Sequence, residues 1–267
     1  ASSIASDMSY STIRFLITVL NWFWNRIYEG IELKGTGKLN AFVDSHTLVY
    51  VPCHRSHLDY LLLSFLLFQK GLMIPHIASG DNLNIPILGK ILRQGGAFFM
   101  RRRFNNDRLY SDVFNEYLYQ IYNQGHSVEF FPEGGRSRSG RLLKPKLGLI
   151  KTSVNLHSKG LRKPIAFVPV YIGYEKIIEG STYVSELRGS KKTREKLSDL
   201  LNNLKLIRQN FGMVQVNIGE VIPLDRWLQA NESDHGEHIN LLAEHMMSSI
   251  NEAATVNSVN LAATVLL

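Results

Sequence analysis

The stretch "TLVYVPCHRSHLDYLLLSFLLFQKG", residues 47–71, decides the fold of this chain. Its apolar run up to Pro52 predicts a buried strand, and the run from Asp59 predicts a helix that ends at Gly71. Two histidines, an arginine and an aspartate lie between the strand and the apolar part of the helix. Four ionisable groups at the mouth of a hydrophobic segment make this turn the first candidate for a functional site.

The rest of the chain alternates between strand and helix patterns. Strands are predicted at 73–79, 95–103, 127–131, 165–174 and 213–222, and helices at 107–125, 146–160 and 236–253. Strands that alternate with helices predict an α/β fold, with a mixed, largely parallel sheet flanked by helices. The polar residues 185–196, rich in lysine and arginine, are predicted to form a basic loop.

The first 30 residues contain an amphipathic helical pattern. Apolar side chains recur at helical spacing, at Ile13, Leu16, Ile17, Leu20, Trp24 and Ile27. Aromatic residues gather near the end of this helix, which is typical of a helix that lies in a membrane interface. Packing on the protein's own core explains the same pattern, so both placements stay open. No segment approaches the ~20 continuous apolar residues of a membrane-spanning helix.

The composition is that of a basic globular protein. The 267 residues contain 30 Lys and Arg against 23 Asp and Glu, a net charge of +7. A hydrophobic content of 45% excludes a disordered chain. The positive charge favours an acidic partner, such as anionic lipid, a phosphorylated small molecule or nucleic acid. A solvated basic surface without a partner is the alternative.

His54 and Asp59 form the first candidate pair. On one regular helix they would lie ~140° apart and could not touch. They meet if His54 lies in the turn after the strand and Asp59 in the first turn of the helix. A carboxylate that accepts the Nδ1–H of an imidazole makes the histidine a competent general base toward a hydroxyl. Alternatively, Asp59 only caps its helix. His54 and His57 alone do not make a metal site, because a metal needs three or four ligands.

The stretch "FFPEGGRSRSGRLLKPK", residues 130–146, is the second candidate. Its glycines expose backbone N–H groups, and Arg136 and Arg138 add guanidinium groups, a combination that suits a phosphate. Arginines 101–103 end another strand and are expected to converge on the same anion. Glu133 is expected either to hold an arginine or to accept a hydrogen bond from a substrate hydroxyl. A basic surface turn with a solvated glutamate is the alternative.

These segments together resemble the glycerolipid acyltransferase superfamily. "HRSHLD" resembles its H-x-x-x-x-D block, "GAFFMRR" its second block, "FPEGGRSRSG" its third and "FVPVYIGY" its fourth. The order and the spacing of the four blocks agree over residues 50–174. The longer forms "PCHRSHLDYLLLS" and "EGGRSRSGRLLKPK" are most similar to the bacterial membrane-bound glycerol-3-phosphate acyltransferases.

The resemblance implies transfer of a fatty acyl group from acyl-CoA or acyl-carrier protein to the 1-hydroxyl of sn-glycerol 3-phosphate. It implies His54 as general base and Asp59 as the group that orients it. The implied substrate-binding positions are Phe99, Arg102, Glu133, Gly134, Arg136, Ser137, Arg138 and Pro169. No metal and no cofactor are expected. Acylation of lysophosphatidic acid by the same mechanism is the nearest alternative, and an anionic-lipid or nucleic-acid binding module without catalysis is a second one.

Members of this subgroup are much longer than 267 residues, so the chain is expected to be their acyltransferase core without its flanks. The expected parts are an interfacial helical segment at 1–30, an acyltransferase domain at 31–255 and the start of a following region at 256–267. These residues contain no basic n-region followed by an apolar h-region and a cleavage site, so no secretory signal is expected. The expected location is the cytoplasmic face of a bacterial inner membrane, on anionic lipid and without nucleic acid.

Overall fold

The computed structural model describes residues 3–101, 107–189, 209–231 and 235–266. Its strands are β1 (Gly30–Lys34), β2 (Thr47–Pro52), β3 (His76–Gly80), β4 (Ala97–Met100), β5 (Val128–Glu129), β6 (Ile165–Tyr174), β7 (Met213–Ile218) and β8 (Ile222–Pro223). Its α-helices are α1 (Tyr10–Ile27), α2 (Asp59–Gln69), α3 (Leu88–Gln94), α4 (Arg108–Asn123), α5 (Leu147–Ser158), α6 (Gly180–Leu187), α8 (Leu224–Ala230), α9 (His235–Glu252) and α10 (Ser258–Leu266).

The strands form one mixed sheet in the order β1-β7-β6-β2-β5-β3-β4, with β8 also paired to β6. The pairs from β4 to β6 are parallel, as is the pair of β1 and β7. Only the pairs of β6 with β7 and with β8 are antiparallel among the described strands. The predicted α/β fold, with a largely parallel sheet flanked by helices, is confirmed.

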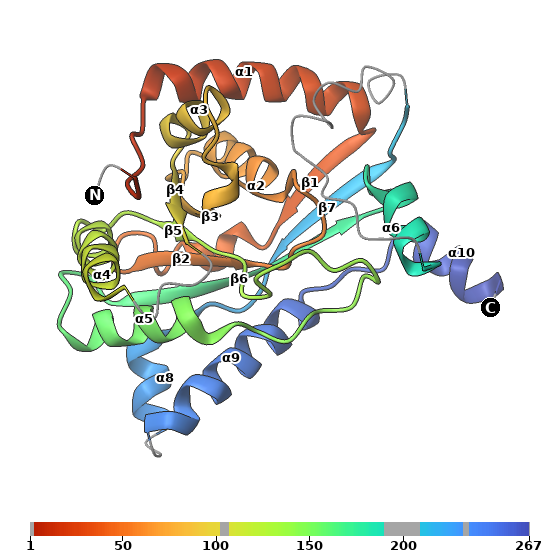
Figure 1. Cartoon of the computed structure of the whole chain (residues 1–267). Coiled ribbons are helices and arrows are strands. Elements are labelled where there is room, and N and C mark those ends of the chain that lie inside the picture. The colour runs from red at the N-terminus through yellow and green to blue at the C-terminus, as the bar shows by residue number, and fades with distance from the viewer. Residues whose placement is uncertain (1–2, 102–106, 190–208, 232–234, 267) are drawn as a thin grey trace.

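Helices cover both faces of the sheet (Figure 1). One core lies between the sheet and the helices α1, α2 and α3, and the other lies beneath α4, α5 and α9. Strand β2 is buried along its whole length. Because side chains alternate along a strand, Leu48 and Tyr50 enter the first core while Val49 and Val51 enter the second. A strand that is apolar on both faces is what a central parallel strand requires.

Helix α1 bears on the two placements that the sequence left open for the first 30 residues, a membrane interface and the protein's own core. Its inner face is part of the first core, where Trp24 and Ile27 are buried. Its outer face carries exposed apolar side chains, with Phe15 67% and Trp22 59% exposed. Packing on the protein's own core is therefore correct for one face of this helix. Within the described residues, no helix is both long and apolar enough to cross a membrane.

Helix α6 corrects the prediction of a basic loop at 185–196. Ser185, Glu186 and Leu187 belong to this helix, and Arg188 and Gly189 follow in a turn. The remainder of the predicted loop lies outside the described residues. Tyr183 is the one buried position in the eight residues of α6. The contacts of Tyr183 with Arg136 and of Glu186 with Arg138 are polar, and hydrophobic periodicity cannot detect them.

Candidate active site

The turn between β2 and α2 brings His54 and Asp59 into contact. The Nδ1 atom of His54 lies 2.9 Å from Oδ2 of Asp59. The same oxygen accepts hydrogen bonds from the backbone N–H groups of Arg55, at 2.7 Å, and Ser56, at 2.9 Å. Asp59 is the first residue of α2 and is completely buried. The carboxylate of Asp59 therefore holds both the backbone of the turn and the imidazole ring of His54.

The hydroxyl of Tyr174 completes the surroundings of Asp59, donating to its Oδ1 atom at 2.7 Å. Burial, and then the charge of Asp59, raise the pKa of Tyr174 well above its usual value, so the hydroxyl keeps its proton and donates. Tyr174 is the last residue of β6, which pairs with β2. The sequence assigned Tyr174 no role, although it ends both the strand and the fourth block, "FVPVYIGY".

The ring of His54 is fixed but accessible. Its Nδ1 atom faces the carboxylate, which leaves Nε2 for a substrate. The ring stacks on Phe131, with the ring centroids 4.1 Å apart. The side chain of His54 is 16% exposed. A histidine held on one nitrogen and reachable on the other has the arrangement that proton abstraction requires.

Glu133 fixes the backbone of His54. Its Oε1 atom accepts the His54 N–H at 2.7 Å, and its Oε2 atom accepts the Leu143 N–H at 2.7 Å. Glu133 is buried, so the alternative of a solvated glutamate is wrong. Both of its oxygens already accept backbone hydrogen bonds within the described structure. The carboxylate ties the turn to the arginine-bearing loop.

Gly134 and Ser137 shape that loop. Gly134 has a φ of +62°, and a Cβ atom there would lie 2.7 Å from Cγ of Lys146, so the position requires glycine. The N–H of Ser137 donates to the carbonyl of His54 at 2.9 Å. The Ser137 hydroxyl donates to the carbonyl of Arg141 at 2.5 Å. We call the turn 53–59, the loop 131–143 and the segment 174–187 the polar edge of the molecule.

The loop arginines face α6. Nη1 of Arg136 donates to the Tyr183 hydroxyl at 2.7 Å and lies 3.5 Å from Oε1 of Glu179. Nε of Arg138 lies 3.0 Å from Oε2 of Glu186. No pattern in the sequence predicted that these two acids would meet the arginines. They balance part of the loop's positive charge.

The remaining predicted residues lie in different surroundings. Arg102 lies outside the described residues. Its neighbour Arg101 pairs with Asp107 at 2.9 Å, which does not support convergence of that arginine on the loop. Phe99 is buried in the core beneath α1 and α2, with the Arg93 guanidinium carbon 4.6 Å from its ring centroid.

Pro169 is buried in β6, opposite Val51 of β2. Proline cannot donate to a sheet, and it lies between the residues of β6 that pair with β7, 170–174, and those that pair with β8, 166–167. The missing N–H falls in the gap between the two pairings. The Pro169 carbonyl still accepts the N–H of Gly219 at 2.8 Å.

Cys53 precedes His54 but is not available as a nucleophile. It is completely buried, and burial raises the pKa of its thiol to about 12. The Ser56 hydroxyl donates to Glu179 and accepts the N–H of Leu58 at 3.1 Å. Among the residues with described positions, no group of three or more His, Cys, Asp or Glu side chains forms a metal site.

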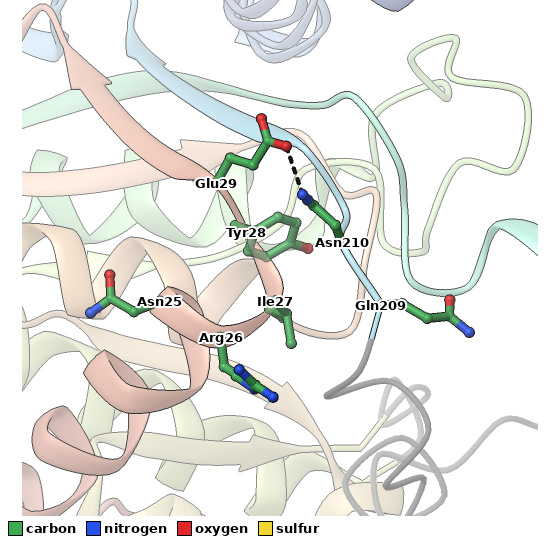
Figure 2. A pocket seen from close by; sticks show the side chains of 7 residues that line it. All are labelled: Asn25, Arg26, Ile27, Tyr28, Glu29, Gln209 and Asn210. Carbon is green, nitrogen blue, oxygen red and sulfur yellow. Dashed lines mark hydrogen bonds between the residues drawn. The ribbon is translucent and has the colours of Figure 1, made fainter.

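Two cavities lie on the α1 side of the molecule. A cavity of about 40 Å³ beneath α1 is almost wholly apolar, and Tyr60, Leu61 and Ser64 of α2 contribute to its wall. A larger cavity of about 260 Å³ lies at the end of α1, where Glu29 accepts a hydrogen bond from Asn210 at 2.6 Å (Figure 2). None of the predicted site residues lines this larger cavity.

Comparisons with known proteins identify the family to which the chain belongs. Residues 30–173 match the acyltransferase family model, and residues 183–267 match the model of the glycerol-3-phosphate acyltransferase C-terminal region. The chain is 48% identical to the glycerol-3-phosphate acyltransferase of Pseudomonas paraeruginosa over 281 residues and 49% identical to that of Pseudomonas putida over 280 residues. Each match covers 100% of this chain but 34% of the relative.

A solved structure supports the fold. The 1-acyl-sn-glycerophosphate (LPA) acyltransferase PlsC from Thermotoga maritima matches with a TM-score of 0.53 at 18% sequence identity. The match covers 92% of this chain and 80% of that protein. At this identity the likeness concerns the fold alone. The family model, by contrast, spans more than half of the chain, so the chain belongs to the acyltransferase family.

Proposed function

We propose that the chain is the acyltransferase part of an enzyme that transfers a fatty acyl group to the 1-hydroxyl of sn-glycerol 3-phosphate. The acyl donor is acyl-CoA or acyl-carrier protein, and the product is lysophosphatidic acid. The observation that carries the proposal is the His54–Asp59 pair, joined through Glu133 and Ser137 to a loop that contains arginines. The names of the Pseudomonas relatives support glycerol 3-phosphate as the acceptor.

In the proposed reaction, Nε2 of His54 takes the proton of the 1-hydroxyl as its oxygen attacks the thioester carbonyl. Asp59 stabilises the imidazolium that forms. When the carbon–sulfur bond breaks, the thiolate leaves and takes the proton back from His54. The serine and the cysteine of the turn are engaged or buried, which favours direct transfer in a ternary complex over a covalent acyl-enzyme.

The two substrates need different surroundings, and the site offers both. The guanidinium groups of Arg136 and Arg138 suit the phosphate of the acceptor, since arginine binds phosphate through two parallel hydrogen bonds. The acyl chain is assigned to the apolar space beneath α1, where the cavity of about 40 Å³ would have to widen to admit it. The active site would then lie where a water-soluble acceptor meets a lipid tail.

The outer face of α1 is assigned to the membrane surface. Phe15, Val19 and Trp22 are exposed at helical spacing, and Arg14 and Arg26 are exposed near the two ends of the helix. Aromatic and apolar side chains flanked by arginines suit the headgroup region of an anionic leaflet. This supports the cytoplasmic face of a bacterial inner membrane as the location.

The proposal is tested by acyl transfer from radiolabelled palmitoyl-CoA, with glycerol 3-phosphate and lysophosphatidic acid as competing acceptors. The full-length protein is used. Lysophosphatidic acid is the expected product. Phosphatidic acid alone would overturn the acceptor and leave the histidine mechanism standing. Binding of anionic vesicles without any turnover would favour a binding module and contradict catalysis.

A further inference from the structure

Glu179 lies where three segments of the polar edge meet. It is the residue before α6, and it is buried. Its carboxylate accepts the Ser56 hydroxyl, at 3.0 Å from both oxygens, and the His57 N–H at 2.9 Å. Nη1 of Arg136 lies 3.5 Å from the same carboxylate. One side chain therefore touches both the turn that carries His54 and the loop that carries the arginines.

Tyr183 makes the same connection one helical turn later. Its hydroxyl donates to the carbonyl of Arg55 at 2.9 Å and accepts from Nη1 of Arg136 at 2.7 Å. Its ring lies against both loop arginines, 5.5 Å from the guanidinium carbon of Arg136 and 5.3 Å from that of Arg138. Residues at positions i and i+4 lie on one face of a helix, so the start of α6 presents both groups to the site.

A buried ion pair is a weak source of stability, because removing both charges from water offsets much of their attraction. Burial raises the pKa of Glu179, and hydrogen bonds from His57 and Ser56 act in the opposite direction. The pKa of Glu179 is raised overall, which is the direction that burial gives. Its contacts instead fix the position of groups on two segments that are far apart in the sequence.

We propose that Glu179 is a positioning residue that sets the place of Arg136 relative to His54. It does so by holding the guanidinium and the turn 54–59 on one carboxylate, with Tyr183 as a second contact between them. The inference rests on the proposed function, in which His54 takes the hydroxyl proton and the arginine loop binds the phosphate of the same acceptor. In that arrangement, Glu179 determines how well the acceptor reaches both groups at once, and it leaves the acyl donor unaffected.

The test is Glu179→Gln in the full-length protein, which keeps the size of the side chain and removes the charge opposite Arg136. We expect kcat/KM for glycerol 3-phosphate to fall by about tenfold to a hundredfold, the usual loss for a hydrogen bond to a charged group. The KM for palmitoyl-CoA should stay within about twofold, since positioning acts on one substrate. Glu179→Asp keeps the charge and should recover part of the loss.

Glu175→Gln is the matched control. Glu175 lies in the same segment but accepts hydrogen bonds from the Met213 N–H and the Ser258 hydroxyl. It should leave both substrates unaffected. If Glu179→Gln does not fold, Tyr183→Phe removes a single hydroxyl and should give the same selective loss in a smaller amount. An equal loss for both substrates, in step with a lower unfolding midpoint, would show a purely structural role and overturn the proposal.

A failure of the proposed function would be detected with the wild-type protein, independently of any variant. If the wild type acylates lysophosphatidic acid instead, the comparison of acceptor with donor is made with that acceptor, which also carries a phosphate. Calorimetric titration with glycerol 3-phosphate measures acceptor binding without turnover, and Glu179→Gln should weaken it. A wild type that binds glycerol 3-phosphate while Glu179→Gln binds it equally well would refute the positioning role alone.

Discussion

We call the core beneath α1 and α2 the apolar side. Both the polar edge and the apolar side bury a carboxyl group completely. Asp59, at the polar edge, accepts hydrogen bonds from His54, Arg55, Ser56 and Tyr174. Glu129 of β5, on the apolar side, has no hydrogen-bond partner for either oxygen among the described residues. Burial, and then the charge of Asp59, raise its pKa well above the usual value.

The difference teaches that burial alone does not mark a functional acid. A carboxylate only accepts hydrogen bonds, so a buried one is stabilised where donors converge on it. Without donors, the same burial favours the protonated acid. At the polar edge, Glu133 and Glu179 also accept hydrogen bonds from the backbone, although burial still raises the pKa of Glu179. Glu129 therefore belongs to a different class of buried acid, and substitutions on the two sides should have different consequences.

His54→Ala should have the largest effect on the polar edge. General acid–base catalysis contributes about a hundredfold to ten-thousandfold, so acyl transfer should fall by about a thousandfold or more. The fold should persist, because the backbone of His54 keeps its hydrogen bonds to Glu133 and Ser137. Turnover and the circular dichroism spectrum are measured together, with the exposed His245 replaced by Ala as control. Near-normal turnover would contradict the assignment of the base.

Asp59→Asn should come next and should affect both activity and stability. The amide can accept on one oxygen only, and its NH₂ group would face the donors that Asp59 now satisfies. We expect turnover to fall by about a hundredfold and the free energy of unfolding to fall by about 1–3 kcal/mol. Urea unfolding and an initial-rate assay measure the two changes. A variant as stable as the wild type would mean that the four donors do not stabilise this carboxylate.

Arg138→Ala should have a moderate effect that is confined to one substrate. The composition of the loop suits a phosphate, so the KM for glycerol 3-phosphate should rise by about tenfold, more than the KM for palmitoyl-CoA. The pair of Arg138 and Glu186 is partly exposed, so its loss should change stability little. Steady-state kinetics with each substrate varied in turn decide the matter. An equal rise for both substrates would count against a phosphate at this loop.

The outer face of α1, which lies over the apolar side, can be changed without disturbing the inner face of the helix. Replacing Phe15 and Trp22 together by Ser should reduce sedimentation with anionic vesicles several-fold, because the apolar area available to the interface falls. The free energy of unfolding should change by less than about 1 kcal/mol, since both side chains are exposed. Replacing the exposed Val184 of α6 is the control. Unchanged sedimentation would refute the interfacial role of this face.

Glu129→Gln should have the smallest effect, and it should raise the stability of the protein where the other substitutions lower it or leave it unchanged. A folded-state pKa above the unfolded value of ~4.3 means that wild-type stability is lost as the pH rises through the window between them. Glutamine cannot ionise, so the variant should exceed the wild type in stability at pH 8 and lose this advantage as the pH approaches 4.5. Urea midpoints at the two pH values test this, with exposed Glu116→Gln as control. A variant less stable at pH 8 would mean that Glu129 is ionised and held by a partner.

The sequence predicted the layers of the fold because they follow from hydrophobic pattern. Strand β2, helix α2 and the turn between them were readable, including the condition under which His54 and Asp59 could meet. Helix α6 was missed, since it is short, buries only Tyr183 and runs into the polar stretch 185–196. Residues 102–106 and 190–208 lie outside the described residues, so Arg102 and the rest of the predicted basic loop stay predictions.

The candidate site was predicted in part, and the rest needed tertiary contacts. The four motif blocks identified the segments that form the site. They did not predict the hydrogen-bond partner of each polar side chain. Glu133 was expected to meet an arginine or a substrate, and it holds two backbone N–H groups. Glu179 and Tyr183 carry no local signal, and Tyr174 is marked only by its place at the end of a strand, because each acts across more than 40 residues on a segment it meets only after folding. The roles of all these residues in the proposed reaction stay predictions until they are measured.

The contacts that fix His54 also bear on when the site forms during folding. Its turn is tied to Glu133, 79 residues later, and through Asp59 and Ser56 to Tyr174 and Glu179, 115 and 123 residues later. Contacts of such long sequence separation form slowly, because a large loop must be closed before they are gained. A chain still emerging from the ribosome would hold the histidine and the aspartate long before it held their supports. The pair of His54 and Asp59 is thus close together in the sequence, but the contacts that support it form late in folding.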